Sequence, residues 1–153
     1  KFAAKHGAKV VAIDIDEPSL ISLYGDIKDK KDILPLVIDV CRPTPAHGLM
    51  GAYPPAETRL ACDLVLALGV THHMVFKRRL QFEAIVKILA TFSRKWLLVE
   101  FIPPEDQHVN AWMTSEFSWY SAKNFHKILK NLFSSVKIVE SSPEPRLLFL
   151  CTK

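Results

Sequence analysis

The chain has 153 residues, of which 49% are hydrophobic and 24% are charged, and its formal net charge is +4. This length predicts one domain, residues 1–153, and the composition excludes a disordered chain. No apolar run reaches the roughly 18 residues that cross a bilayer, which excludes a membrane-spanning helix. The positive charge permits an acidic partner such as a nucleic acid but does not indicate one, since the basic residues are scattered.

The cysteines and the first residues bear on the cellular compartment. Cys41, Cys62 and Cys151 are odd in number and form no C-x-x-C pair. The N-terminal residues lack the apolar core of a signal peptide. We therefore expect reduced thiols in a cytoplasmic protein, with no metal site. The chain begins with Lys1 rather than methionine, which predicts a fragment or a processed protein.

Strand-like and helix-like segments alternate along the chain, which predicts parallel β-α-β units. The first residues indicate the tail of a helix that ends at Gly7. A strand of the buried type follows at 9–15. Asp16 then suits the N-cap of a short helix that has Pro18 in its first turn. A second strand is predicted at 34–40.

The middle of the chain combines a long loop with two more strands. The loop, residues 41–58, carries four prolines and two glycines. Its length indicates a functional loop or one that is partly ordered by packing. The pattern then predicts a strand at 63–68, a helix at 80–92 and a strand at 96–101.

The last part of the chain predicts a hairpin. An irregular, aromatic-rich segment at 105–120 precedes a helix at 122–133. The final strands, 136–139 and 147–151, are joined by a short Ser/Pro-rich turn. Because a parallel crossover needs about a dozen residues, these two strands are expected to be antiparallel neighbours. The predicted fold class is an α/β, Rossmann-like sheet, mostly parallel, with an antiparallel C-terminal hairpin.

Four strand-end motifs, covering nearly all of the chain, resemble those of class I S-adenosylmethionine-dependent methyltransferases. They are Val10-Val11-Ala12-Ile13-Asp14-Ile15-Asp16, Val37-Ile38-Asp39-Val40, DLVLALGVTHH at 63–73 and WLLVEFIPP at 96–104. The resemblance implies S-adenosyl-L-methionine as cofactor and methyl transfer to an acceptor that the sequence does not reveal. A weaker resemblance, at 48–59 and in the LLVEFIPPED segment, points to a methyltransferase group related to nodulation proteins.

The family's first strand and its glycine-rich loop have no counterpart in the sequence. The resemblance places that strand centrally, between the strands that end at Asp14 and at Leu68, so we expect a gap in the sheet. Without the loop, the methionine carboxylate of the cofactor lacks its backbone cradle. Because the gap exposes apolar strand edges, we expect low solubility or self-association of the isolated chain.

The resemblance implies a set of cofactor-binding residues. Asp14 lies at the carboxyl end of a strand, where a carboxylate can accept hydrogen bonds from both ribose hydroxyls; the alternative is an ordinary loop acid. Asp39 would accept from the adenine amino group while Val40 donates its backbone N–H, unless Asp39 only forms a turn. Ile15 and Leu68 complete the set.

Two adjacent histidines are the candidate catalytic residues. His72 and His73 follow the strand that ends at Leu68, at the expected mouth of the pocket. A neutral imidazole takes up a proton at neutral pH, so either would serve as general base for a hydroxyl acceptor. The alternative is a packing or hydrogen-bonding role. Neighbouring side chains usually point apart, so no metal site is predicted.

Four further residues are candidates for the acceptor site. Glu100 lies within an apolar strand, so it either faces the pocket as a buried acid or pairs with a nearby base. Trp112, Trp119 and Tyr120 lie in an insert that often covers the acceptor in this fold, where aromatic side chains form flat apolar walls. The alternative is that they only fasten the insert to the core.

Two other functions stay open at this stage. A nicotinamide-dependent oxidoreductase uses the same ribose-binding acid, although its sheet normally stays parallel throughout. A degenerate methyltransferase fold kept for protein contact is favoured if the natural chain begins at Lys1. Within the methyltransferase class, the acceptor is either a small molecule or a macromolecule such as a nucleic acid.

Overall fold

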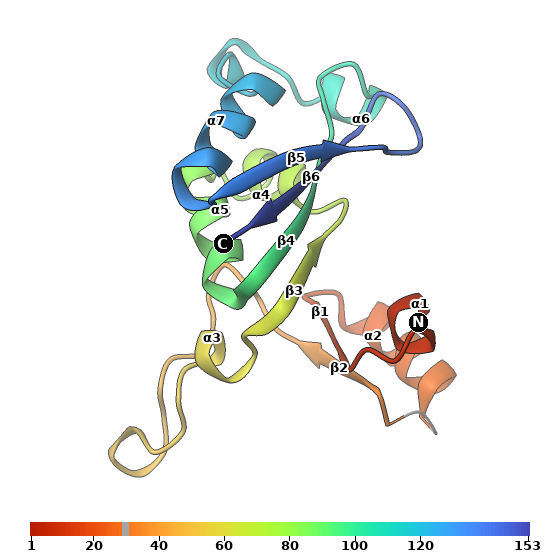
Figure 1. The fold of residues 1–153 in the computed structure, drawn as a ribbon, viewed down its shortest axis with the longest axis vertical. Helices are drawn as coiled ribbons and strands as arrows, with labels where there is room; N and C mark the ends of the chain where they lie inside the picture. Colours follow the sequence, from red (N-terminus) through yellow and green to blue (C-terminus); the bar gives the residue numbers. More distant parts are fainter. Residues whose placement is uncertain (29–30) are drawn as a thin grey trace. The chain divides into compact units, whose positions relative to one another are not determined.

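The computed structural model describes residues 1–28 and 31–153. It divides into two compact units, Lys1–Leu60 and Ala61–Lys153. Each unit has a sheet of its own (Figure 1). The expectation of a single domain over 1–153 stays a prediction.

The first unit contains a two-stranded parallel sheet. Its elements are α1 (Phe2–Lys5), β1 (Val10–Asp14), α2 (Glu17–Ile27), β2 (Ile33–Val37), the 3-10 turn η1 (Leu49–Gly51) and α3 (Ala56–Arg59). Helix α2 lies against both strands and buries Leu20 and Ile27. The strands pair with Asp14 beside Val37. Asp14 and the segment after β2 therefore lie at the same, carboxyl edge of this small sheet.

Two local predictions in this unit are confirmed. The first helix ends before Gly7, whose φ of +82° is a conformation that glycine adopts without steric cost. Asp16 is the N-cap of α2, and its carboxylate accepts the backbone N–H of Ser19.

Two other predictions in the first unit need correction. The second strand ends at Val37 rather than at residue 40, because Asp39 bends the chain: its main-chain oxygen accepts the N–H of Arg42. The loop at 41–58 also has local structure. It contains η1 and α3, and a bridge between His47 and Tyr53 closes it.

The second unit contains a four-stranded mixed sheet with the order β3–β4–β6–β5 (Figure 1). Its elements are β3 (Cys62–Ala67), α4 (Thr71–Phe76), α5 (Phe82–Phe92), β4 (Ser93–Phe101), α6 (Gln107–Asn110), the 3-10 turn η2 (Ser115–Phe117), α7 (Ala122–Leu132), β5 (Ser135–Val139) and β6 (Leu147–Thr152). Strands β3 and β4 are parallel, and β6 runs antiparallel to both of its neighbours. The predicted antiparallel hairpin is confirmed, with its last strand inserted beside β4.

Helices α4, α5 and α7 contact this sheet and enclose the main core. The core residues of the central strands are fully buried; they are Leu97, Val99 and Phe101 of β4, with Phe149 and Cys151 of β6. They pack with aromatic side chains from the helices, among them Phe82 and Phe125, whose ring centroids lie 4.8 Å apart. Burial of these large apolar side chains is the main stabilising contribution in this unit.

The opposite face of the sheet is open at its β3 edge. Leu64 and Leu66 of β3 are 44% and 51% exposed, and Trp96 of β4, beside Leu64, is 42% exposed. Within the described residues, β3 pairs with β4 alone, and the strands β1 and β2 form a separate sheet. The strands that end near Asp14 and near Leu68 therefore belong to separate sheets, and the gap expected between them stays a prediction.

Several boundaries in the second unit differ from the prediction. Helix α4 was not predicted, and the helix expected at 80–92 begins at Phe82. Strand β4 begins at Ser93, directly after α5, rather than at residue 96, so it also contains Arg94 and Lys95. The segment 105–120 contains α6 and η2. None of the described helices has the length and apolar character needed to cross a membrane.

Candidate functional site

The carboxylate of Asp14 is oriented by the turn that it begins. Its Oδ1 accepts the backbone N–H groups of Ile15, at 2.7 Å, and of Asp16, at 3.0 Å. Within the described residues its Oδ2 accepts no hydrogen bond, and the side chain is exposed. An oriented carboxylate oxygen at the carboxyl end of a parallel strand suits a pair of ribose hydroxyls.

Asp39 and Val40 lie at the same edge, just after β2. Oδ1 of Asp39 accepts the backbone N–H of Cys41 at 3.0 Å, which is the turn-forming role that the sequence left open. The backbone N–H of Val40 donates to no other described residue. This donor is available for a ligand. The turn formed by Asp39 is therefore compatible with a hydrogen bond from Val40 to the adenine ring.

In the second unit, a buried acid organises the carboxyl end of β4. Oε2 of Glu100 accepts the backbone N–H of Gly69 at 2.8 Å, and its Oε1 lies 3.7 Å from Nη1 of Arg146. The main-chain oxygen of Glu100 accepts the hydroxyl of Thr71 at 2.7 Å. Glu100 therefore pairs with a base, one of the two alternatives drawn from the sequence.

Arg146 also joins this acid to a second one. Its Nη2 lies 3.7 Å from Oδ2 of Asp106. Burial raises the pKa of Asp106, but the backbone N–H groups of His108 and Val109 and the charge of Arg146 outweigh it and lower that pKa overall. Asp106 is thus held in its charged form beside Arg146.

The candidate catalytic histidines lie on α4. Burial, followed by the neighbouring His73, lowers the pKa of His72 to about 4. Burial and the charge of Lys77 also lower the pKa of His73. The Nδ1 atoms of both rings are buried and have no hydrogen-bond partner in the described part of the chain. At pH 7 the structure therefore presents neutral imidazoles here.

The aromatic-rich segment at 105–120, called the insert below, contains the three predicted aromatic residues. Trp112 lies beside the two histidines, whereas Trp119 and Tyr120 pack against the core. The ring centroid of Trp112 lies 6.0 Å from that of His72 and 5.5 Å from that of His73. Tyr120 is buried and its hydroxyl donates to the carbonyl of Ile102 at 2.7 Å, and Trp119 packs edge-on against Phe82 at 4.9 Å. The latter two contacts fasten the insert to the core.

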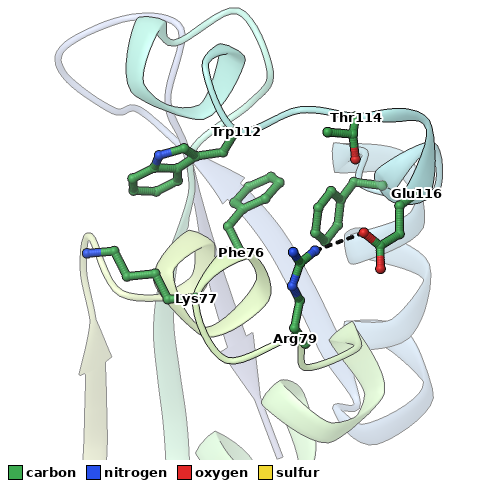
Figure 2. A pocket seen from close by; sticks show the side chains of 7 residues that line it. Phe76, Lys77, Arg79, Trp112, Thr114 and Glu116 are labelled. Atoms are coloured by element: carbon green, nitrogen blue, oxygen red, sulfur yellow. Dashed lines mark hydrogen bonds and ion pairs between the residues drawn. The ribbon is translucent and has the colours of Figure 1, made fainter.

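A pocket of about 250 Å³ lies between α4 and the insert (Figure 2). Its lining includes Phe76, Lys77, Arg79, Trp112, Glu116 and Phe117. Sequence reasoning missed Phe76, Lys77 and Arg79 as site residues, because the scattered basic residues of the chain did not indicate a binding site. Lys77 and Arg79 follow the end of α4 and line the pocket together with aromatic residues of the insert.

The predicted site residues thus form two groups, each within one unit. Asp14, Ile15, Asp39 and Val40 belong to the first unit, whereas the histidines, Glu100 and Trp112 belong to the second, as does the exposed Leu68. Among the residues with described positions, no group of three or more His, Cys, Asp or Glu side chains is placed to hold a metal ion.

Comparison with known proteins gives a consistent fold. No family model matches the sequence. The magnesium protoporphyrin IX methyltransferase ChlM from Synechocystis PCC 6803, solved with bound SAH, superposes with a TM-score of 0.63 at 14% identity, covering 98% of this chain and 66% of ChlM. The chain has the class I methyltransferase fold.

Two more similarities accompany this fold. The N-methyltransferase NodS from Bradyrhizobium japonicum WM9 superposes with a TM-score of 0.62 at 14% identity, covering 94% of this chain and 72% of NodS. The nodulation protein NoeA of Rhizobium meliloti (strain 1021) is 25% identical over 140 residues, which are 90% of this chain and 29% of NoeA. The chain therefore spans less than a third of that relative.

Proposed function

We propose that this chain forms part of an S-adenosylmethionine-dependent methyltransferase. The observation that carries the proposal is the antiparallel strand β6, inserted between β4 and β5. This antiparallel strand distinguishes the sheet of a methyltransferase from the sheet of a nicotinamide-binding domain, which is parallel throughout. The methyltransferase neighbours in fold support the same reaction class.

The residues of the first unit fit the nucleoside part of the cofactor. Oδ2 of Asp14 would accept hydrogen bonds from the ribose hydroxyls, because Oδ1 already accepts the backbone N–H groups of Ile15 and Asp16. The backbone N–H of Val40 would donate to the adenine ring, with Asp39 beside the exocyclic amino group. The chain has no counterpart of the glycine-rich loop, so it offers no equivalent cradle for the methionine carboxylate.

When bound, the cofactor supplies an electrophilic methyl group on a sulfonium. The protein orients donor and acceptor, which lowers the entropic part of the barrier. A hydroxyl acceptor that gains the methyl group must lose its proton, and a neutral imidazole is a suitable base. A base works best when its pKa is near the working pH, and the pKa of about 4 makes His72 a weak one. We assign this role to His73, whose side chain is less buried than that of His72.

Ligand titration of the full-length natural protein that carries these residues tests the proposal. We expect calorimetry to show binding of S-adenosylhomocysteine. We expect the fluorescence of NADH to show no saturable change when the protein is added. Absence of S-adenosylhomocysteine binding at millimolar concentration would overturn the assignment. NADH binding in its place would support an oxidoreductase, and binding of neither would support a non-catalytic domain.

A further inference from the structure

The pocket beside α4 has aromatic walls from two elements. Phe76 comes from α4 and Trp112 from the insert (Figure 2). Phe117 of η2, which is part of the insert, also lines the pocket. The ring centroid of Phe76 lies 5.8 Å from that of Trp112 and 4.7 Å from that of Phe117. The volume of about 250 Å³ is below the roughly 300–1,000 Å³ of pockets for drug-sized ligands. The pocket therefore suits a small planar ring system.

The charges around the pocket leave one cation unneutralised. Nη1 of Arg79 lies 2.9 Å from Oε2 of Glu116, and its guanidinium stacks over Phe117 at 4.9 Å. Nζ of Lys77 lies 5.5 Å from the ring centroid of Trp112 and forms no ion pair within the described residues. Figure 2 shows Lys77 and Trp112 together at one end of the pocket, and the ion pair at the other.

We propose that this pocket binds the methyl acceptor, and that the acceptor is a small aromatic acid. Its ring would pack against Trp112 and Phe76, and its carboxylate would accept a hydrogen bond from the ammonium of Lys77. A hydroxyl on the ring would gain the methyl group as the methyl–sulfur bond of the cofactor breaks, S-adenosylhomocysteine would leave, and the hydroxyl proton would pass to His73. The assignment of the ligand as acceptor rests on the proposed function. Trp112 also packs against His73, so the same aromatic wall connects the pocket with the proposed base.

A matched pair of probes tests this inference in the full-length protein. 2-Naphthoate carries the required ring and charge, and 2-naphthamide has the same shape without the charge. We expect calorimetry to show tighter binding of 2-naphthoate. Lys77→Gln should weaken 2-naphthoate binding roughly five- to tenfold and leave 2-naphthamide unchanged. Trp112→Leu should weaken binding of both probes.

Lys95 provides the control substitution. Its Nζ lies 5.7 Å from the ring of Trp96, so it is also a cation over an exposed tryptophan, but it lies on β4 away from the pocket lining. Lys95→Gln should leave the binding of both probes unchanged. Equal binding of the two probes, equal effects of the two lysine substitutions, or no probe binding at millimolar concentration would overturn the inference.

The titrations with S-adenosylhomocysteine separate this inference from the proposed function. If S-adenosylhomocysteine binds and 2-naphthoate does not, the methyltransferase proposal stands and the inference about the pocket is wrong. If 2-naphthoate binds in a Lys77-dependent way and S-adenosylhomocysteine does not bind, the pocket takes aromatic acids and its assignment to a methyl acceptor is wrong.

Discussion

Glu100 accepts the backbone N–H of Gly69 at 2.8 Å and so joins the end of β4 to the turn that follows β3. Gly69 has a φ of +66°, a left-handed conformation that glycine adopts readily. The side chain of Glu100 is largely buried, with 10% of it exposed. Its other oxygen, Oε1, forms an ion pair with Nη1 of Arg146. The turn that leads into α4 and its histidines therefore depends on one acid.

Replacement of this acid should destabilise the second unit. Glu100→Ala leaves the N–H of Gly69 and the guanidinium of Arg146 without their partner, so we expect a loss of about 2–3 kcal/mol in the free energy of unfolding. Glu100→Gln keeps an acceptor for the N–H and should lose about 1 kcal/mol. Urea unfolding followed by circular dichroism measures both losses.

Glu116 provides the control for this prediction. It forms an ion pair with Arg79 at the surface, where 68% of the Glu116 side chain is exposed. Glu116→Ala should cost no more than about 0.5 kcal/mol. Equal losses for the Ala variants at positions 100 and 116 would show that the buried acid does not support the turn.

Protonation of His72 should destabilise the fold in mild acid. Its pKa is about 4 in the folded chain and about 6.5 in an unfolded chain. Between these values the unfolded state binds more protons, so stability is retained at pH 7 and is lost as the pH falls toward 4. We expect this residue alone to account for about 2 kcal/mol between pH 7 and pH 5.

The variant His72→Gln isolates this contribution. Glutamine does not titrate, so the difference in unfolding free energy between the wild type and the variant should shrink or reverse as the pH falls. Urea unfolding at pH 7, 6 and 5 measures the change. A difference that stays constant over this range would show that burial of His72 has no effect on its protonation.

The open edge of the second sheet should promote self-association of the isolated chain. Leu66 has an exposed side chain and lies on β3, which pairs with β4 alone among the described strands and so presents an edge. We expect Leu66→Lys to lower the fraction of oligomer in sedimentation velocity. Leu49→Lys, at an 87% exposed leucine of η1, should not lower it. A monomeric wild type, or equal effects of both substitutions, would contradict this prediction.

The strands and the antiparallel hairpin at the end of the chain were predictable from the sequence, because local signals determine them. Four apolar strands end in polar or turn residues, and the connection before the last strand is too short for a parallel crossover. Asp16 and Gly7 also give direct signals, since an N-cap and a left-handed helix end depend on one residue each.

The site in the second unit was less predictable, because its signals are not local. Helix α4 has six residues, and five of them are buried, so it shows no amphipathic pattern. Strand β4 follows α5 without a turn signal. The pairing of Glu100 with Arg146, and of Lys77 with Trp112, joins residues that are far apart in the sequence. Composition gives no indication of such contacts.

The central claim depends on the carboxylate of Asp14, and a pair of asparagine variants tests it most directly. Asp14→Asn removes the charge from the proposed ribose site, whereas Asp16→Asn removes a charge two residues away and keeps a good N-cap for α2. We expect calorimetry of the full-length protein to show S-adenosylhomocysteine binding weakened roughly tenfold or more by Asp14→Asn, and unchanged by Asp16→Asn. Equal affinity of the wild type and the Asp14→Asn variant would contradict the account.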